Sequence, residues 1–275
     1  MRKSDTVTSE RPEMNEEVLR AWCLEQLGSS PVAEIFRASH LSVVVGLKLA
    51  DGREVVVKVR PLQHRLFGCF EVQRHLFDSG FPCPEPLLNP TPLGSWCASA
   101  ERLVAGGYAS PPSARDPMPF ASPLAQVIRI ATPLAAQVDL EPKPSWNRWD
   151  HAERGIWPVA EDSERPLNEV VGPAWLDRAG SVARECLATG AGPVVIGHGD
   201  WYSENLRFHD HGLLVAMTGT ASSPIANPSS LVSLLPTTSL PTWRSLLHSS
   251  PPTRKRRIEI LPQPRFGSAG ERACG

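Results

Sequence analysis

One short stretch of the chain has residue types and spacing that fit phosphoryl-transfer chemistry. It reads His198-Gly-Asp200-Trp-Tyr-Ser-Glu-Asn205, which gives the pattern H-x-D-x-x-x-x-N. A carboxylate in such a loop can face an incoming hydroxyl, and an amide five residues later can reach a Mg²⁺ ion on the phosphates. A strand is expected before the loop and a hairpin after it. The alternative interpretation is an ordinary polar loop with a capping aspartate.

The second candidate is a lysine inside an apolar strand. Lys58 lies in the run Val55-Val-Val-Lys58-Val59, where an unpaired ammonium group would be costly to bury. In kinases a lysine placed in this way binds the α- and β-phosphates and pairs with a helix glutamate. Glu71 is the only carboxylate between Lys58 and Asp78, and it lies on a predicted helix. A lysine on an edge strand that points to solvent is the alternative.

A phosphate-covering loop should precede that strand. The candidate is the segment 37–42, in which Ser39, His40 and Ser42 can donate hydrogen bonds. The segment lacks the glycines that let backbone amides approach a phosphate closely. An ordinary hairpin turn explains the same residues equally well.

The elements around these residues change character along the chain. Apolar periodicity predicts a helix over 16–27, β-structure over 31–49, a hairpin turn at 51–52, a strand over 54–59, a helix over 66–77 and a strand over 96–104. Helical patterns follow over 122–136 and 175–188, with an irregular region at 141–172 between them. A strand at 193–196 and a hairpin of 206–208 with 213–216 flank the H-x-D-x-x-x-x-N loop. A β-rich half therefore precedes a helical half, which favours two lobes.

Together these features resemble the aminoglycoside phosphotransferase/choline kinase family over about residues 15–217. The resemblance implies an α+β, bilobal protein-kinase-like fold with a β-rich N-lobe and a helical C-lobe. It implies ATP and Mg²⁺ as cofactors and transfer of the γ-phosphate to a hydroxyl of a small molecule. Family loops commonly have a second histidine where Tyr202 stands here. The implied roles are Asp200 as catalytic base, Asn205 as Mg²⁺ ligand, Lys58 on phosphate, Glu71 orienting Lys58, and the Leu103–Val104 backbone facing adenine.

Overall composition narrows the function classes. The chain has 275 residues, 28 Lys+Arg against 29 Asp+Glu and a net charge of −1, so its overall charge gives no general argument for a nucleic-acid or anionic-membrane partner. The basic run at 254–257 is interpreted as a solvated charge run, with a nucleic-acid or localisation patch as the alternative. No apolar run approaches the roughly 20 residues that span a bilayer. The N-terminal residues lack an apolar signal core, and the six cysteines show no C-x-x-C pair. We therefore expect a cytoplasmic protein with reduced cysteines.

One part of the family pattern is missing. A second metal carboxylate is expected just after the 206–216 hairpin, usually as Asp-Trp-Asp. The chain instead continues Met217-Thr-Gly-Thr-Ala-Ser-Ser, and no aspartate follows Asp210. Reading from the third base of the Met217 codon gives GAC, NGG, NAC, NGC and NTC, which permits Asp-Trp-Asp-Ser-Leu. We interpret residues 217–275 as an out-of-frame tail, and a genuine disordered tail on a diverged relative is the alternative.

The composition of the tail agrees with that interpretation. Residues 218–275 hold eight Pro, ten Ser and six Thr, and seven Lys+Arg against two Glu. Prolines at this density forbid long helices. We predict a disordered N-terminus at 1–14, an N-lobe at 15–108, a C-lobe at 109–216 that is incomplete after about 217, and a disordered or out-of-frame tail with little packed secondary structure at 217–275. The function hypotheses are an impaired phosphotransferase, a non-catalytic nucleotide-binding protein, and a non-functional truncated product.

Overall fold

A computed structural model describes residues 15–39, 42–109, 118–159, 167–188, 194–201, 203–210, 212–217 and, as backbone only, 222–226. The chain divides into two units, residues 1–233 and 234–275, and every described residue belongs to the first. The predicted disordered N-terminus at 1–14 and most of the predicted tail lie outside the described residues. The α+β class expected from the sequence is confirmed, as the elements below show.

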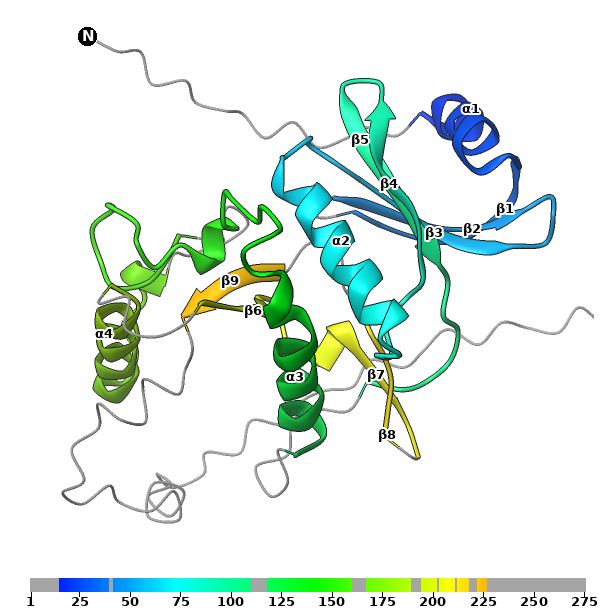
Figure 1. The fold of residues 1–275 in the computed structure, drawn as a ribbon. Coiled ribbons are helices and arrows are strands. Elements are labelled where there is room, and N and C mark those ends of the chain that lie inside the picture. Colours follow the sequence, from blue (N-terminus) through cyan, green and yellow to red (C-terminus); the bar gives the residue numbers. More distant parts are fainter. Residues whose placement is uncertain are drawn as a thin grey trace, which may run out of the picture. The chain divides into compact units, whose positions relative to one another are not determined.

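The N-terminal part is built on a five-stranded antiparallel sheet with the order β1-β2-β3-β5-β4 (Figure 1). Side chains alternate along β3: the odd-numbered valines are buried in the core, and the even-numbered positions face the other side. One face of the sheet is therefore committed to packing, and the other is available for a site. The strands are β1 (Pro31–Ser39), β2 (Val43–Leu49), β3 (Glu54–Arg60), β4 (Pro86–Leu93) and β5 (Trp96–Arg102).

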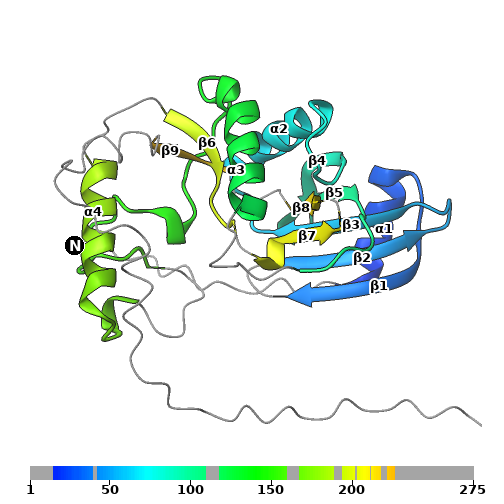
Figure 2. The ribbon, with the colours of Figure 1, turned by 90° about the horizontal axis from the view of Figure 1, so that it is seen from below.

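Two helices cover opposite faces of this sheet (Figures 1 and 2). Helix α1 (Glu16–Leu27) is capped by the Asn15 side chain, which accepts a hydrogen bond from the Glu17 amide. Trp22 of α1 packs into the core with the valines of β2 and β3. Helix α2 (Arg65–Asp78) follows β3 and lies on the other face. The sheet is thus held from both sides, while part of the α2 face remains open.

Strand β4 was not predicted from the sequence, because Pro86–Leu93 reads PLLNPTPL. Proline cannot donate to a β-ladder, so its presence argued against a strand. In the structure β4 is the last strand of the sheet and pairs only with β5, with irregular register. An edge strand tolerates prolines because one side of its backbone needs no partner.

The second half of the unit contains helix α3 (Met118–Ala131) and two short two-stranded sheets. Strands β7 (Leu206–His209) and β8 (Gly212–Ala216) form one pair, as predicted. Strand β6 (Val194–His198) pairs with β9 (Ser222–Ala226), a short strand within the segment predicted to be a disordered or out-of-frame tail. A second core joins α2 to these elements. Its buried members include Val72, Leu76, Val127, Ile196, Leu206, Phe208 and Ala216.

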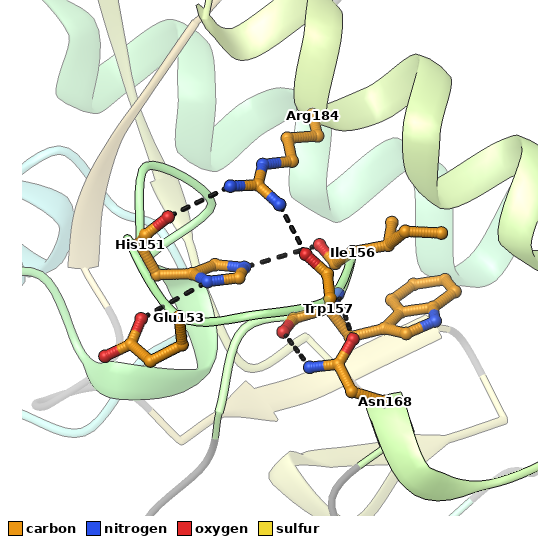
Figure 3. A network of polar contacts seen from close by, with 7 residues as sticks. His151, Glu153, Ile156, Trp157, Asn168 and Arg184 are labelled. Atoms are coloured by element: carbon orange, nitrogen blue, oxygen red, sulfur yellow. Dashed lines mark hydrogen bonds and ion pairs between the residues drawn. The ribbon is translucent and has the colours of Figure 1, made fainter.

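Helix α4 (Ala174–Ala188) is held mainly by polar contacts (Figure 3). Arg184 donates to the backbone oxygens of His151 and Gly155, and the Asn168 side chain bonds both the amide and the oxygen of Trp157. The described part of the irregular segment predicted at 141–172 is therefore hydrogen-bonded to α4.

The apolar face of α4 is otherwise poorly covered. Gly180 is its only buried residue, and the side chains of Trp175 and Val182 are 61% and 47% exposed. An amphipathic helix normally buries its apolar stripe. Among the described residues, no element covers this face of α4 fully.

Two general expectations can be compared with the described residues. No helix in the described ranges is long and apolar enough to cross a membrane. Five of the six cysteines are described and all five are free thiols, four of them buried. Burial raises the pKa of the Cys23 thiol to about 11, so this group stays protonated and unreactive at neutral pH.

Candidate active site

A cavity of about 470 Å³ lies between the open face of the sheet and the loop after β6. It contains Lys58 of β3 together with Asp200 and Asn205 of the loop, although about 140 residues separate the two segments. Its lining also includes Leu103 and Val104, as the sequence predicted for the adenine end. The remaining lining residues are Phe36, Ser42, Val44, Val56, Arg60, Pro84, Glu101, Arg102, His198, Glu204, Arg207 and Met217.

The register of the sheet explains how the cavity wall is formed. One row across four strands holds Phe36, Gly46, Val56 and Glu101, and the next row holds Val44, Lys58 and Ser99. Gly46 is required in the first row, because a Cβ there would lie 2.3 Å from the Phe36 ring. Without that Cβ the ring can lie over β2. Together the two rows place an apolar patch of Phe36, Val44 and Val56 beside a charged patch of Lys58 and Glu101.

The predicted ion pair between Lys58 and Glu71 is not formed. The Lys58 ammonium lies 2.7 Å from the Glu101 carboxylate on β5, and the two side chains are only 13% and 6% exposed. Glu71 instead lies on the exposed side of α2. Helix periodicity explains the difference, since Val72, Gln73 and Leu76 take the buried face of α2 and turn Glu71 outward.

Asp200 and Asn205 are joined directly. The Asn205 side-chain nitrogen donates to the Asp200 carboxylate at 2.8 Å and to the Asp200 backbone oxygen at 2.9 Å. With its nitrogen committed to Asp200, Asn205 has its amide oxygen as the atom suited to a metal ion. The neighbouring Trp201 anchors the loop, because its indole N–H donates to the Phe120 backbone oxygen of α3 at 3.0 Å.

His198 fixes the start of the loop. Its Nε2 lies 2.9 Å from the Met217 backbone oxygen, and its Nδ1 lies 3.3 Å from the Asp200 amide. These contacts suit the neutral Nε2–H tautomer, which donates to one and accepts from the other. Burial lowers the pKa of His198, while the Met217 oxygen and the Asp200 carboxylate act in the opposite direction. The ring is thus a structural link between the loop and the end of β8.

We expect His198 to make stability depend on pH. Because its pKa is lower in the folded state than in the unfolded one, the unfolded chain binds more protons below an unfolded pKa of about 6.5. The free energy of unfolding should therefore fall as the pH drops from about 6.5 toward the folded pKa. Urea unfolding of the wild type and of His198→Gln at pH 7.5 and at pH 5.5 measures this. An equal pH dependence in both proteins would contradict the assignment.

The predicted phosphate-covering loop is only partly placed. Ser42 lines the cavity beside Val44. Ser39 ends β1 with an exposed side chain and is not among the cavity-lining residues. His40 lies outside the described residues. Of the two candidates that the structure describes, Ser42 is the one that lines the cavity.

One backbone group at the predicted adenine end already has a hydrogen-bond partner. The Leu103 amide donates to the Glu54 oxygen at 3.0 Å. Within the described ranges, no backbone partner is found for the Leu103 oxygen or the Val104 amide. An acceptor and a donor close together on one strand end can bind the edge of a purine base. The apolar neighbours Val44 and Val56 suit the faces of such a base.

Several cavity residues were missed by the sequence analysis. Glu101 could have been found as a carboxylate placed among small apolar residues of a predicted strand. Phe36 gave no signal, because only the register brings it over Gly46. Glu204 and Arg207 are close in sequence to the predicted Asn205, so the sequence placed them near the site. It did not show that their side chains line the cavity.

The residue directly after β8 does not supply the second metal carboxylate that the family resemblance implies. Met217, which lines the cavity directly after β8, stands where the second metal carboxylate was expected. Mg²⁺ requires oxygen ligands, and a thioether sulfur does not replace a carboxylate. Among the described residues, no group of three or more His, Cys, Asp or Glu side chains could hold a metal ion. The residues present therefore fit a nucleotide better than they fit a nucleotide with its full metal complement.

The outward position of Glu71 gives a simple prediction. Glu71→Gln should leave nucleotide affinity unchanged within about twofold and the free energy of unfolding unchanged within about 0.5 kcal/mol, as for other surface substitutions. Calorimetric titration with ADP and urea unfolding check both values. A large loss of affinity would return the lysine-pairing role to Glu71.

The order of these elements identifies the fold. A lysine on the third strand, a helix, two further strands, and an H-x-D-x-x-x-x-N loop between β6 and β7 follow the arrangement of kinases. The fold is kinase-like. Among the described elements, the helices that should complete the C-lobe beside α4 are absent, in agreement with the predicted incompleteness.

Comparisons with known proteins found similar structures only. No family model matches the chain, and no curated protein matches it. Among solved structures, it is similar to an aminoglycoside phosphotransferase from Alicyclobacillus acidocaldarius, with 14% identity and a TM-score of 0.48 over 84% of this chain and 73% of that chain. Spectinomycin phosphotransferase in complex with ADP and spectinomycin gives 12% identity and 0.47 over 78% and 71%.

A third similar structure is a thermostable mutant of an aminoglycoside phosphotransferase in a ternary complex with ADP and hygromycin B. Its identity is 15% and its TM-score 0.45, over 78% of this chain and 75% of that chain. At such low identities and TM-scores, the ligand of this chain has to be inferred from its own cavity.

Proposed function

We propose that this chain binds an adenine nucleotide in the cavity between the sheet and the β6–β7 loop. The single observation that carries the proposal is that one cavity holds Lys58, Asp200 and Asn205 together. The phosphates lie toward Lys58, and the base lies against Val44 and Val56 with its edge toward Leu103 and Val104. Four cationic side chains and three carboxylates line the cavity, so its lining carries a small excess of positive charge that suits an anionic ligand.

We further propose that the ancestral reaction of this protein is transfer of the ATP γ-phosphate to a hydroxyl of a small molecule. Asp200 is placed to accept the hydroxyl proton, since its carboxylate is held by Asn205 and faces the cavity. Mg²⁺ would be held through the Asn205 amide oxygen. Because Met217 replaces the second carboxylate, we propose that transfer is impaired in this chain while nucleotide binding remains.

Nucleotide-dependent thermal stabilisation tests the proposal. A ligand at 100 times its Kd stabilises the folded state by about 2.7 kcal/mol, which for a folded unit of this size corresponds to a rise in Tm of about 5 °C or more. We expect ADP and ATP to give such a rise, and Lys58→Met to remove most of it. The same nucleotides should not shift the Tm at all if the chain is a non-functional product without a binding site.

A further inference from the structure

The partner that fixes Lys58 is part of the sheet. Val56 lies opposite Glu101 and Lys58 lies opposite Ser99, so Lys58 and Glu101 are diagonal neighbours on adjacent antiparallel strands. Long side chains can bridge this diagonal separation. The 2.7 Å ion pair shows that they do so here, on the face that forms the cavity wall.

The Glu101 carboxylate is itself held by α2. Its second oxygen accepts a hydrogen bond of 3.0 Å from the Gln73 side chain, which also donates to the Pro84 oxygen at 2.9 Å. Gln73 and Glu101 are 4% and 5% exposed. The two carboxylate oxygens thus have separate tasks, one toward Lys58 and one toward Gln73. A buried carboxylate with both oxygens bound has little freedom to turn.

A second buried cation lies on the same wall of the cavity as Lys58 and Glu101. Arg60 lies two residues after Lys58 on the same strand, is only 7% exposed, and lines the same cavity. Burial lowers the pKa of Arg60, and the Glu101 carboxylate is among the charges that oppose this effect. The Glu101 carboxylate therefore interacts electrostatically with two cations of the cavity wall.

We propose that Glu101 is the residue that positions Lys58 toward the nucleotide phosphates, with Gln73 of α2 orienting Glu101. In the kinase arrangement expected from the sequence, a helix glutamate has this task. Here the carboxylate comes from β5, and the helix contributes only a neutral amide. The lysine is therefore fixed by two hydrogen-bonded strands, and its position depends on the sheet. This inference rests on the proposed nucleotide binding.

The test separates the phosphate contribution from binding of the base. The Kd values of ADP and adenosine are measured by calorimetry, and their ratio reports how well the phosphates are held. In Glu101→Gln, which keeps the size of the side chain, we expect the ratio of adenosine Kd to ADP Kd to fall about tenfold, with adenosine affinity unchanged. Glu101→Asp keeps the charge, and the flexible lysine stem can follow it, so the ratio should stay within about threefold of the wild type. Glu25→Gln on α1, on the opposite face of the sheet, removes one carboxylate away from the cavity and serves as the matched control.

Each outcome decides between specific alternatives. A purely structural role of Glu101 would weaken adenosine and ADP equally, and this result would overturn the positioning role. An unchanged ratio in Glu101→Gln would overturn it as well, because Glu101 would then have no influence on how the phosphates are held. An increased ratio would also do so, because the carboxylate would then have acted on the phosphates only by charge repulsion. A wild-type chain that binds ADP no better than adenosine would overturn the proposed function, and the positioning role with it.

Discussion

Shifting the reading frame at codon 217 is expected to raise Mg²⁺-dependent phosphoryl transfer by about 10²–10³-fold over that of the present chain. This is the usual effect of one group that stabilises the transition state at a reacting centre. The shifted frame permits Asp-Trp-Asp directly after β8, where Met217 now lines the cavity. A carboxylate there would supply the second ligand for the Mg²⁺ that we propose Asn205 holds. Transfer from ATP to a panel of amino sugars, choline-like alcohols and macrolides, followed as ADP release, measures the gain.

Two comparisons make this prediction specific. Met217→Asp in the present chain restores only the carboxylate, so it should recover part of the gain without improving stability. In the frame-shifted chain, replacing the aspartate at codon 217 by alanine should remove the gain in activity while leaving the improved solubility. An early stop codon in the shifted frame, or a shifted sequence without a helical pattern, would show that the tail is native to this protein.

The second large effect is a separation of roles between Asp200 and Lys58 in the frame-shifted chain. Asp200→Ala should lower transfer by about 10²–10⁴-fold, the usual contribution of a general base, and change ATP affinity by less than about threefold. Lys58→Ala should instead weaken ATP binding by about tenfold or more, because its ammonium faces the phosphates. Single-turnover rates and calorimetric Kd values distinguish the two. Equal losses of affinity in both variants would place Asp200 on the nucleotide and remove it from acceptor activation.

The parts of the site that depend on local spacing were predictable from the sequence. In the loop after β6, Asp200 and Asn205 are five residues apart, and the hydrogen bond between them follows from that spacing. Lys58 was found because an ammonium group in an apolar strand needs a partner. The identity of that partner was not predictable in the same way. Glu71 is near Lys58 in sequence and on the expected helix, but helical phase turns it to solvent.

What could not be read from the sequence depends on strand order and register. Glu101 reaches Lys58 because β5 pairs with β3, although β4 comes between them in the chain. The prolines of β4 concealed that strand, and an edge position explains why they are tolerated. Strand β9 was missed because the composition of the tail predicted no structure, whereas in the structure the backbone of β6 offers it a partner. Backbone pairing depends less on side-chain composition than core packing does.

The most direct measurement of the central claim is labelling with an acyl-phosphate derivative of ATP, which transfers its acyl group to a lysine amine held beside the bound phosphates and releases ATP. Mass spectrometry of the digested protein then locates the modified residue. If the nucleotide binds as proposed, Lys58 is acylated, and excess unlabelled ATP protects it. Labelling that spares Lys58, or that is insensitive to excess ATP, would contradict the claim that the cavity of Lys58, Asp200 and Asn205 is a nucleotide site.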